Sequence, residues 1–164
     1  MKHLCGLVAN LIEEKSWMLA TAESCTGGMI AATCTDRAGS SVWFERGFVT
    51  YSNAAKTGML GVDAALIAQH GAVSEAVVRA MVQGALTHSL AQVAVAVTGV
   101  AGPGGGSADK PVGTVWFGFA LPNHVSTEMR HFGGNRAAVR QATVRHALTR
   151  LAELINPEKS LCAY

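Results

Sequence analysis

Apolar side chains recur every three or four positions in several stretches of the chain. Leu4, Leu7 and Val8 begin such a pattern near the amino end, which predicts an amphipathic helix. Ser74 stands directly before another such stretch, where a serine side chain suits the N-cap position of a helix. The predicted helices cover residues 2–15, 27–35, 53–60, 75–89 and 133–155.

Runs of apolar and β-branched residues predict strands between these helices. The run AQVAVAVTG is almost continuously apolar, which is typical of a strand at the centre of a sheet covered on both faces. Pro122, Asn123 and His124 separate the last two runs and predict a hairpin. The predicted strands cover residues 17–24, 44–52, 91–99, 113–121 and 125–132.

Helices that alternate with strands, followed by a late hairpin, predict the fold class. We expect an α/β protein: a three-layer α/β/α domain with a mixed, mostly parallel sheet and a C-terminal helix. The 164 residues contain no linker-like stretch and no internal repeat. One domain over residues 1–164, with a core from about 4 to 155, is therefore expected.

Composition narrows the range of partners. Hydrophobic residues make up 49% of the chain and charged residues 15%, which argues against disorder. The formal net charge is +2 and no basic run occurs, so a nucleic-acid partner is not expected. No stretch reaches the roughly 20 apolar residues that a membrane span needs. A few arginines remain to bind an anionic small molecule.

The cysteines and the amino end indicate a cellular compartment. Cys5, Cys25, Cys34 and Cys162 form no C-x-x-C pair and no regular spacing, so free thiols are expected rather than disulfides or a zinc site. The segment MKHLCGLVANLIEEK carries no cleavage signature of a signal peptide. The expected location is the cytoplasm.

The stretch TAESCTGG contains the first candidate chemistry. A strand that ends at Ser24 and turns through Gly27 and Gly28 into a helix aims backbone N–H groups and the positive helix end at one point. A hydroxyl there is suited to attack an acyl carbon while the N–H groups of residues 26–28 hold the oxyanion. In the alternative interpretation, Ser24 or Thr26 only caps the helix. Cys25 is a rival nucleophile, although a buried structural thiol is the simpler interpretation.

The stretch YSNAAKTG supplies a candidate base. None of the six histidines has a suggestive context, whereas Lys56 follows Tyr51 and Ser52 at the end of a predicted strand. A lysine serves as a base when burial lowers its pKa from about 10.4 toward 7–8. Tyr51 would relay or orient the proton. A surface lysine on a short helix is the alternative.

Two glycine-rich stretches are candidates for substrate binding. VTGVAGPGGGSADKPVG lets backbone N–H groups approach a ligand, although it matches neither nucleotide-binding glycine motif. Thr98 at the strand end and Gly102 in the loop are its candidate residues. HFGGNRAAVR begins the last helix, and Arg136 and Arg140 lie one turn apart, which suits a phosphomonoester. A mobile surface loop and exposed arginines are the alternatives.

Five segments of the sequence resemble one family. They are TAESCTGG, GSSVWFERGFVTYSNAAKTGMLGV, HGAVSEAVV, AVTGVAGPGGGSADKPVGTVWFGFA and GNRAAVRQAT. In this order they resemble the CinA (competence/damage-inducible protein) C-terminal domain family, from about residue 4 to 155. The chain is similar to the stand-alone members, the nicotinamide-nucleotide amidohydrolases (NMN deamidases), and is expected to lack the additional N-terminal domain of the larger CinA proteins.

The resemblance implies an activity and roles for residues. Family members hydrolyse nicotinamide mononucleotide (NMN) to nicotinic acid mononucleotide and ammonia in pyridine nucleotide (NAD) salvage, without a metal or other cofactor. By resemblance, Ser24 corresponds to the nucleophile and Lys56 to the general base. Residues implied in the same pocket are Tyr51, Ser41, Thr98 and Arg140, the last two on the ribose and phosphate side. The resemblance also implies a homo-oligomer, a dimer or higher.

Other classes of function remain open from the sequence. The same loop and arginines would serve a non-catalytic nucleotide-binding or regulatory module, which would release no ammonia. A metal-dependent pyrophosphatase needs clustered acidic residues, but the 11 acidic residues are scattered. An interaction protein of the competence or DNA-damage response has no visible basic face to support it.

Overall fold

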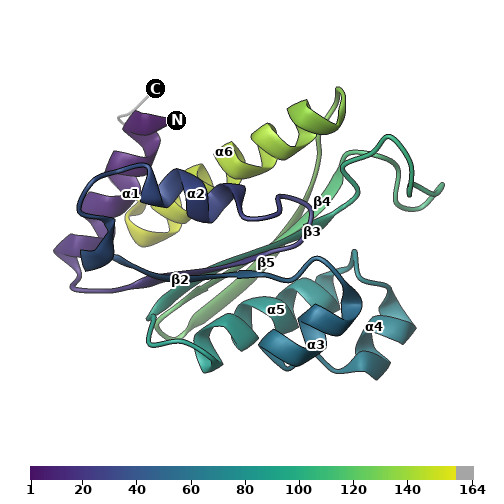
Figure 1. Ribbon diagram of the computed structural model, residues 1–164, viewed down its shortest axis with the longest axis horizontal. Coiled ribbons are helices and arrows are strands. Elements are labelled where there is room, and N and C mark those ends of the chain that lie inside the picture. Colours follow the sequence, from purple (N-terminus) through teal and green to yellow (C-terminus); the bar gives the residue numbers. More distant parts are fainter. Residues whose placement is uncertain (158–164) are drawn as a thin grey trace.

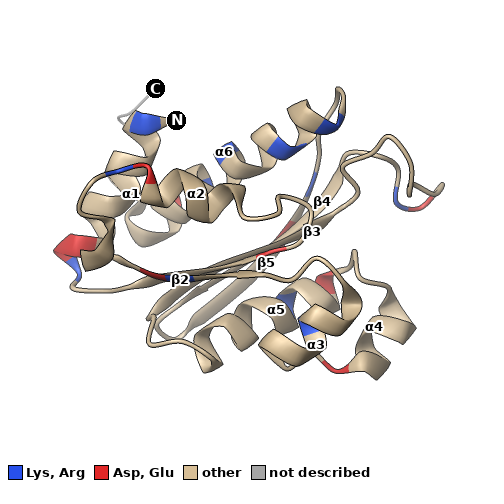
Figure 2. Ribbon diagram, viewed as in Figure 1, with Lys and Arg blue, Asp and Glu red and all other residues tan. Residues whose placement is uncertain are grey.

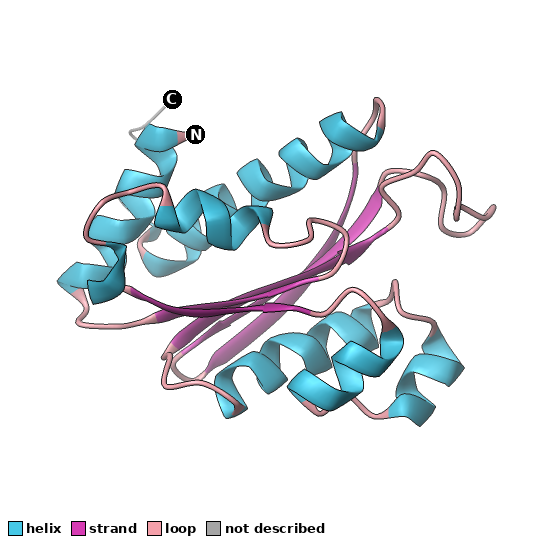
Figure 3. Ribbon diagram, in the orientation of Figure 1, coloured by secondary structure: helices cyan, strands magenta, loops and turns pink. Residues whose placement is uncertain are grey.

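Three layers make up the protein, with a sheet between two groups of helices (Figure 1, Figure 3). The structure is a computed structural model that describes residues 1–157. The helices α1, α2 and α6 cover one face of the sheet, and α3, α4 and α5 cover the other (Figure 1). The elements are α1 Lys2–Glu14, β1 Leu19–Glu23, α2 Met29–Thr35, the 3-10 helix η1 Ser40–Val42, β2 Phe44–Val49, α3 Asn53–Leu60, α4 Ala64–His70, α5 Glu75–Thr87, β3 Val93–Gly99, β4 Thr114–Leu121, β5 His124–His131 and α6 Arg136–Ile155.

The sheet is mixed, with strand order β2-β1-β3-β4-β5. The strand β1 pairs in parallel with both β2 and β3. The hairpin of β4 and β5 then extends the sheet in antiparallel fashion from β3. Parallel strands have their carboxyl ends at one edge, so the loops after β1, β2 and β3 meet there.

Alternating side chains on the central strands build two cores. On β3, Val93, Val95 and Val97 face α1, α2 and α6, while Ala94 and Ala96 face α5. The small side chains let α5 lie close to the sheet. A Cβ added to Gly118 would sit 2.9 Å from the Val78 carbonyl oxygen of α5. The central strand β3 is buried on both faces, as its apolar run predicts.

The structure confirms the predicted fold class and most predicted elements. The short helix predicted over residues 53–60 is α3, capped by the Ser52 hydroxyl, which accepts from the Ala55 N–H. Ser74 caps α5 as predicted, and its hydroxyl accepts from the Val77 N–H. Two elements, α4 and η1, were not predicted from the sequence. Both are short, and neither shows a full helical repeat of apolar residues.

Two predictions concern residues beyond those that the structure describes. Cys162 and the end of the predicted domain at residue 164 lie outside the described residues. In residues 1–157, no helix is long and apolar enough to cross a membrane. The charged residues of the described chain are scattered over its helices, strands and loops (Figure 2).

Candidate active site

A pocket opens where the parallel strands end. The turn after β1, the segment between β2 and α3, and the end of β3 surround it, because all three lie at the carboxyl edge of the sheet. Its volume is about 220 Å³. The lining residues are Ser24, Cys25, Tyr51, Asn53, Lys56, Ala72, Val73, Thr98, Gly99, Ala101 and Arg136.

Ser24 and Lys56 meet in this pocket from segments 32 positions apart. The Lys56 Nζ lies 3.1 Å from the Ser24 Oγ. The Ser24 N–H donates to the Val97 carbonyl, which holds the residue at the end of the sheet. Ser24 is 8% exposed, so its hydroxyl is reached only through the pocket.

The surroundings of Lys56 suit a proton acceptor. Its side chain is 1% exposed, and burial lowers the pKa of its amine from the usual value of 10.5. The Nζ also donates to the Thr50 carbonyl at 2.9 Å and to the Tyr51 carbonyl at 3.4 Å. A neutral amine has two N–H bonds and one lone pair. With both N–H bonds on these carbonyls, the lone pair is left for the Ser24 hydroxyl.

Cys25 lies beside Ser24 and also lines the pocket. Burial raises the pKa of its thiol to about 11. A thiol is nucleophilic as the thiolate, which is scarce far below the pKa. Cys25 is therefore a poor rival to Ser24 as a nucleophile near neutral pH.

The turn after Ser24 is held by the carboxylate of Glu23, which is fully buried. Glu23 Oε2 accepts from the Gly28 N–H at 3.1 Å, and the Gly27 N–H donates to the Ser24 carbonyl. Both glycine amides are thus engaged within the protein, which corrects the expectation that they face an oxyanion. Both glycines have positive φ, at 60° and 97°, which favours glycine at these positions. Of the three amides expected there, that of Thr26 remains.

Arg136 and Tyr51 form the outer rim of the pocket. The Arg136 Nη2 donates to the Tyr51 phenol oxygen at 3.2 Å, and its Nη1 donates to the Gly102 carbonyl at 2.8 Å. Gly102 therefore fixes Arg136 but does not itself line the pocket. Thr98 lines the pocket floor, where its hydroxyl donates to the Ala72 carbonyl.

Two residues expected in the pocket lie outside it. Arg140 points to the nucleophile turn instead, and its Nη2 donates to the Thr26 carbonyl at 2.8 Å. Ser41 is exposed on η1, before the amino end of β2, whereas Tyr51 follows the carboxyl end of that strand. The structure therefore brings together Ser24, Lys56, Tyr51, Thr98 and Arg136, and leaves Ser41 and Arg140 apart from them.

Two polar residues of this region were not among those predicted from the sequence. Asn53 lines the pocket at the start of α3, and Glu23 supports the turn from inside. The signal for Glu23 was present, since a charged residue ends a strand that is otherwise apolar or Thr, LATAE. A charged group in such a strand needs buried partners.

A larger hollow of about 830 Å³ lies elsewhere, lined mainly by α2 and α6. Its lining includes Met29, Thr33, Gln141, Arg145 and His146. It contains none of the predicted site residues. Within residues 1–157, no group of three or more His, Cys, Asp and Glu side chains is arranged to hold a metal ion.

The fold and the pocket define a class: an α/β protein with a buried serine–lysine pair at the carboxyl edge of a mixed sheet. The chain belongs to the CinA C-terminal domain family, whose model matches residues 1–155. This family membership confirms the resemblance seen in the sequence.

Named relatives cover nearly the whole chain. It is 57% identical over 146 residues to the nicotinamide-nucleotide amidohydrolase PncC of Enterobacter agglomerans, covering 88% of this chain and 89% of that protein. It is 52% identical over 152 residues to the protein of the same name from Escherichia coli K12, covering 92% of each. A crystal structure of a CinA-superfamily protein from Klebsiella pneumoniae superposes with a TM-score of 0.90 at 40% identity, covering 94% of this chain and 96% of that one. The chain is an enzyme.

Proposed function

We propose that this enzyme hydrolyses the carboxamide of NMN to give nicotinic acid mononucleotide and ammonia. The observation that carries the proposal is the 3.1 Å contact between the Ser24 Oγ and the Lys56 Nζ in a pocket. Relatives named nicotinamide-nucleotide amidohydrolases, 52–57% identical to this chain, support the choice of substrate.

Acylation begins with proton transfer from Ser24 to Lys56. The neutral amine accepts the hydroxyl proton while its two N–H bonds stay on the Thr50 and Tyr51 carbonyls. The Ser24 Oγ then attacks the carboxamide carbon and forms a tetrahedral oxyanion. Collapse of this intermediate breaks the C–N bond, and Lys56 returns the proton to the departing ammonia.

Deacylation reuses the same two residues. The nicotinoyl ester on Ser24 is attacked by water, whose proton passes to Lys56. The C–O bond to Ser24 breaks, and Lys56 returns the proton to the serine oxygen. The product is nicotinic acid mononucleotide, whose carboxylic acid loses its remaining proton to solvent, and both catalytic groups regain their starting state.

The proposed oxyanion donors are backbone N–H groups beside Ser24 that donate to no backbone carbonyl of the described chain. Among residues 1–157, no backbone carbonyl accepts from the N–H groups of Cys25 and Thr26. An oxyanion hole commonly uses the N–H of the residue directly after the nucleophile. Cys25 and Thr26 are therefore the proposed donors, in place of Gly27 and Gly28.

Arg136 is the proposed anchor for the substrate phosphate. It reaches the pocket rim beside Tyr51, and a guanidinium binds a phosphate through two parallel hydrogen bonds. Substrate binding would displace its bond to the Tyr51 phenol oxygen. Thr98 and Asn53 line the space between the rim and the Ser24–Lys56 pair, which suits contacts to the ribose.

The first test incubates NMN with wild-type protein and with Ser24→Ala, without added metal. Wild type should release ammonia and a product that has exchanged NH2 for OH, read by mass spectrometry. Ser24→Ala should give neither, with an unchanged circular dichroism spectrum. Turnover by Ser24→Ala would remove Ser24 as the nucleophile, and binding of NMN without turnover by wild type would favour the non-catalytic module.

The proposal also covers the organisation of the protein. We propose one catalytic domain over residues 1–164, acting on a free small molecule in the cytoplasm, and assembling as a homo-oligomer. Light scattering coupled to size-exclusion chromatography measures the mass in solution. A monomer at working concentration would contradict the oligomer.

A further inference from the structure

The Glu23 carboxylate lies directly behind the nucleophile and is fully buried. It does not line the pocket. Four donors surround it, which is enough to compensate a buried carboxylate for its lost hydration. They are the Thr26 hydroxyl at 2.6 Å and the N–H groups of Gly28 at 3.1 Å, Ile30 at 3.0 Å and Ala31 at 2.8 Å.

These bonds determine the shape of the turn that carries Ser24. Glu23 ends β1, and its side chain bends back over the start of α2, so residues 24–28 are closed into a loop between the two ends of this contact. The carboxylate also lies at the N-terminus of α2, where the helix dipole is positive. Two of the four bonds reach this loop, at Thr26 and Gly28, and the other two reach the start of α2, so the loop has few conformations left and Ser24 is held in position.

The backbone of Glu23 holds the other half of the pair. Its carbonyl accepts from the Thr50 N–H at 2.8 Å, and the Thr50 carbonyl accepts from the Lys56 Nζ at 2.9 Å. Residue 23 is therefore joined by its side chain to the turn of Ser24, and through Thr50 to the amine of Lys56.

Arg140 braces the same turn from outside. It donates to the Thr26 carbonyl, while Glu23 accepts from the Thr26 hydroxyl. Thr26 is thus held between a cation and an anion, one on each side. Its backbone N–H, one of the proposed oxyanion donors, is positioned by the same two contacts.

We propose that Glu23 is a positioning residue that sets the distance between Ser24 and Lys56 and the aim of the oxyanion donors. It acts through the turn and touches neither substrate nor reacting atoms. This inference rests on the proposed function, because its effect on the rate is read from NMN hydrolysis.

The direct test is Glu23→Gln. The amide keeps the size of the side chain but replaces one acceptor oxygen by an NH2 group, which faces N–H or O–H donors. We expect kcat to fall about 100-fold, the effect of a displacement near 1 Å. KM should stay within about twofold, since the substrate contacts are intact. The pH at which kcat/KM falls on the acid side should stay in place, because Lys56 remains the base.

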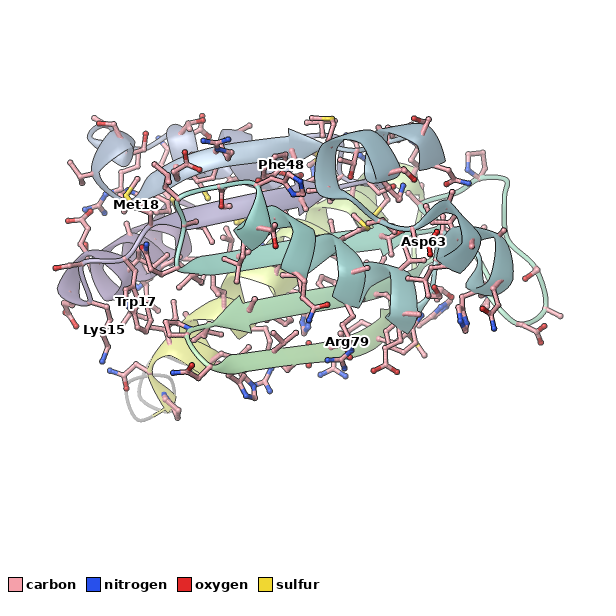
Figure 4. The ribbon with its side chains drawn as sticks, turned by 90° about the horizontal axis from the view of Figure 1, so that it is seen from below. Lys15, Trp17, Met18, Phe48, Asp63 and Arg79 are labelled. Atoms are coloured by element: carbon pink, nitrogen blue, oxygen red, sulfur yellow. The ribbon has the colours of Figure 1, made fainter. Side chains whose placement is uncertain are left out.

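Asp63→Asn is the matched control. Asp63 also caps a helix, α4, where its carboxylate accepts from the Ala65 N–H, and it lies on the α3–α4–α5 side of the molecule (Figure 4). The substitution makes the same chemical change outside the pocket. Kinetic constants of this variant should equal those of wild type, which shows that a carboxylate-to-amide change at a helix cap does not by itself alter turnover.

A second pair of variants covers the case in which Glu23→Gln fails to fold. Thr26→Val removes one of the four donors and keeps the shape of the side chain, whereas Thr26→Ser keeps the hydroxyl. We expect Thr26→Val to lower kcat about tenfold, close to the loss of one charge-assisted hydrogen bond, and Thr26→Ser to recover most of it. Equal kcat for these two variants would overturn the inference.

The outcomes separate the inference from the proposed function. A wild-type kcat for Glu23→Gln overturns the inference and leaves the amidohydrolase standing. If wild type releases no ammonia from NMN, the proposed function fails. The inference is then judged by the rate at which a fluorophosphonate labels Ser24. Slower labelling of Glu23→Gln than of wild type and Asp63→Asn supports it, while equal labelling, or no labelling of wild type, overturns it.

Discussion

The two ends of the pocket differ in how firmly the protein holds them. At the inner end, Ser24 and Lys56 are buried and tied to the ends of three strands by hydrogen bonds. At the outer end, Tyr51 is 60% exposed, and Arg136 is held by one phenol and one loop carbonyl. The inner end therefore has its geometry before substrate arrives, whereas the outer end can rearrange around it.

This difference matches the demands of the task proposed for each end. Proton transfer and attack depend on distances of a few tenths of an ångström, so the groups involved gain from a rigid, water-excluded setting. Phosphate binding relies on a charged, forked side chain that tolerates adjustment. Substitutions at the inner end should therefore act on kcat, and those at the rim on KM.

The largest expected effect is the loss of Lys56. Lys56→Met should lower kcat by at least about 1,000-fold, since it removes the proton acceptor for every step. In wild type, activity should fall as pH decreases through the lowered pKa of Lys56, because protonation fills the lone pair. Ammonia release across a pH series measures both the loss of kcat in Lys56→Met and the pH dependence of wild type. Activity of Lys56→Met across neutral pH would contradict the lysine base.

Arg136→Ala and Arg140→Ala compare the outer and the inner end of the pocket directly. Arg136→Ala should raise KM for NMN about tenfold or more, the worth of hydrogen bonds to a charged group, and change KM for the unphosphorylated riboside little. Arg140→Ala should lower kcat for both substrates, because it loses its bond to the Thr26 carbonyl. A larger increase in KM for Arg140→Ala than for Arg136→Ala would indicate that the phosphate binds beside the turn of Ser24 instead.

Burial of Lys56 also predicts a pH dependence of stability. The folded pKa of Lys56 lies below its usual value of 10.5, so between the two values the unfolded chain binds more protons. The free energy of unfolding of wild type should therefore rise with pH through this window, relative to that of Lys56→Met. Below the folded pKa the penalty is fully present. Denaturant titrations of both proteins at neutral and alkaline pH measure the difference, and parallel curves would contradict it.

The smallest expected effect concerns Cys25. With its pKa raised to about 11, the thiol should alkylate slowly in the native protein and rapidly after unfolding. Iodoacetamide labelling followed by mass spectrometry of the Cys25 peptide gives both rates. Fast native labelling would show that the inner end opens more readily than its hydrogen bonds indicate.

The sequence by itself determined most elements and the main chemical candidates. Apolar periodicity predicted the helices and strands because the central strands are buried on two faces and each amphipathic helix on one. The spacing of apolar residues therefore indicates both the type of element and its layer in the fold. The proposed nucleophile and base were candidates from the sequence because glycines and a strand end mark the turn of Ser24, and Lys56 follows the next strand in a mostly uncharged segment. The short helix α4 was missed because its apolar residues run consecutively, AALIA, and show no helical period.

Only the tertiary structure decided how the remaining polar groups divide their work. The sequence placed Arg136 and Arg140 on one helix, yet the fold turns the first toward Tyr51 and the second toward Thr26. In the folded protein, the N–H groups of Gly27 and Gly28 donate to acceptors inside the protein, and the Glu23 carboxylate supports the turn. Such contacts join residues far apart in the chain or depend on the exact path of a loop. The local sequence marks Glu23 as a charge that needs buried partners, but it does not specify which groups these are.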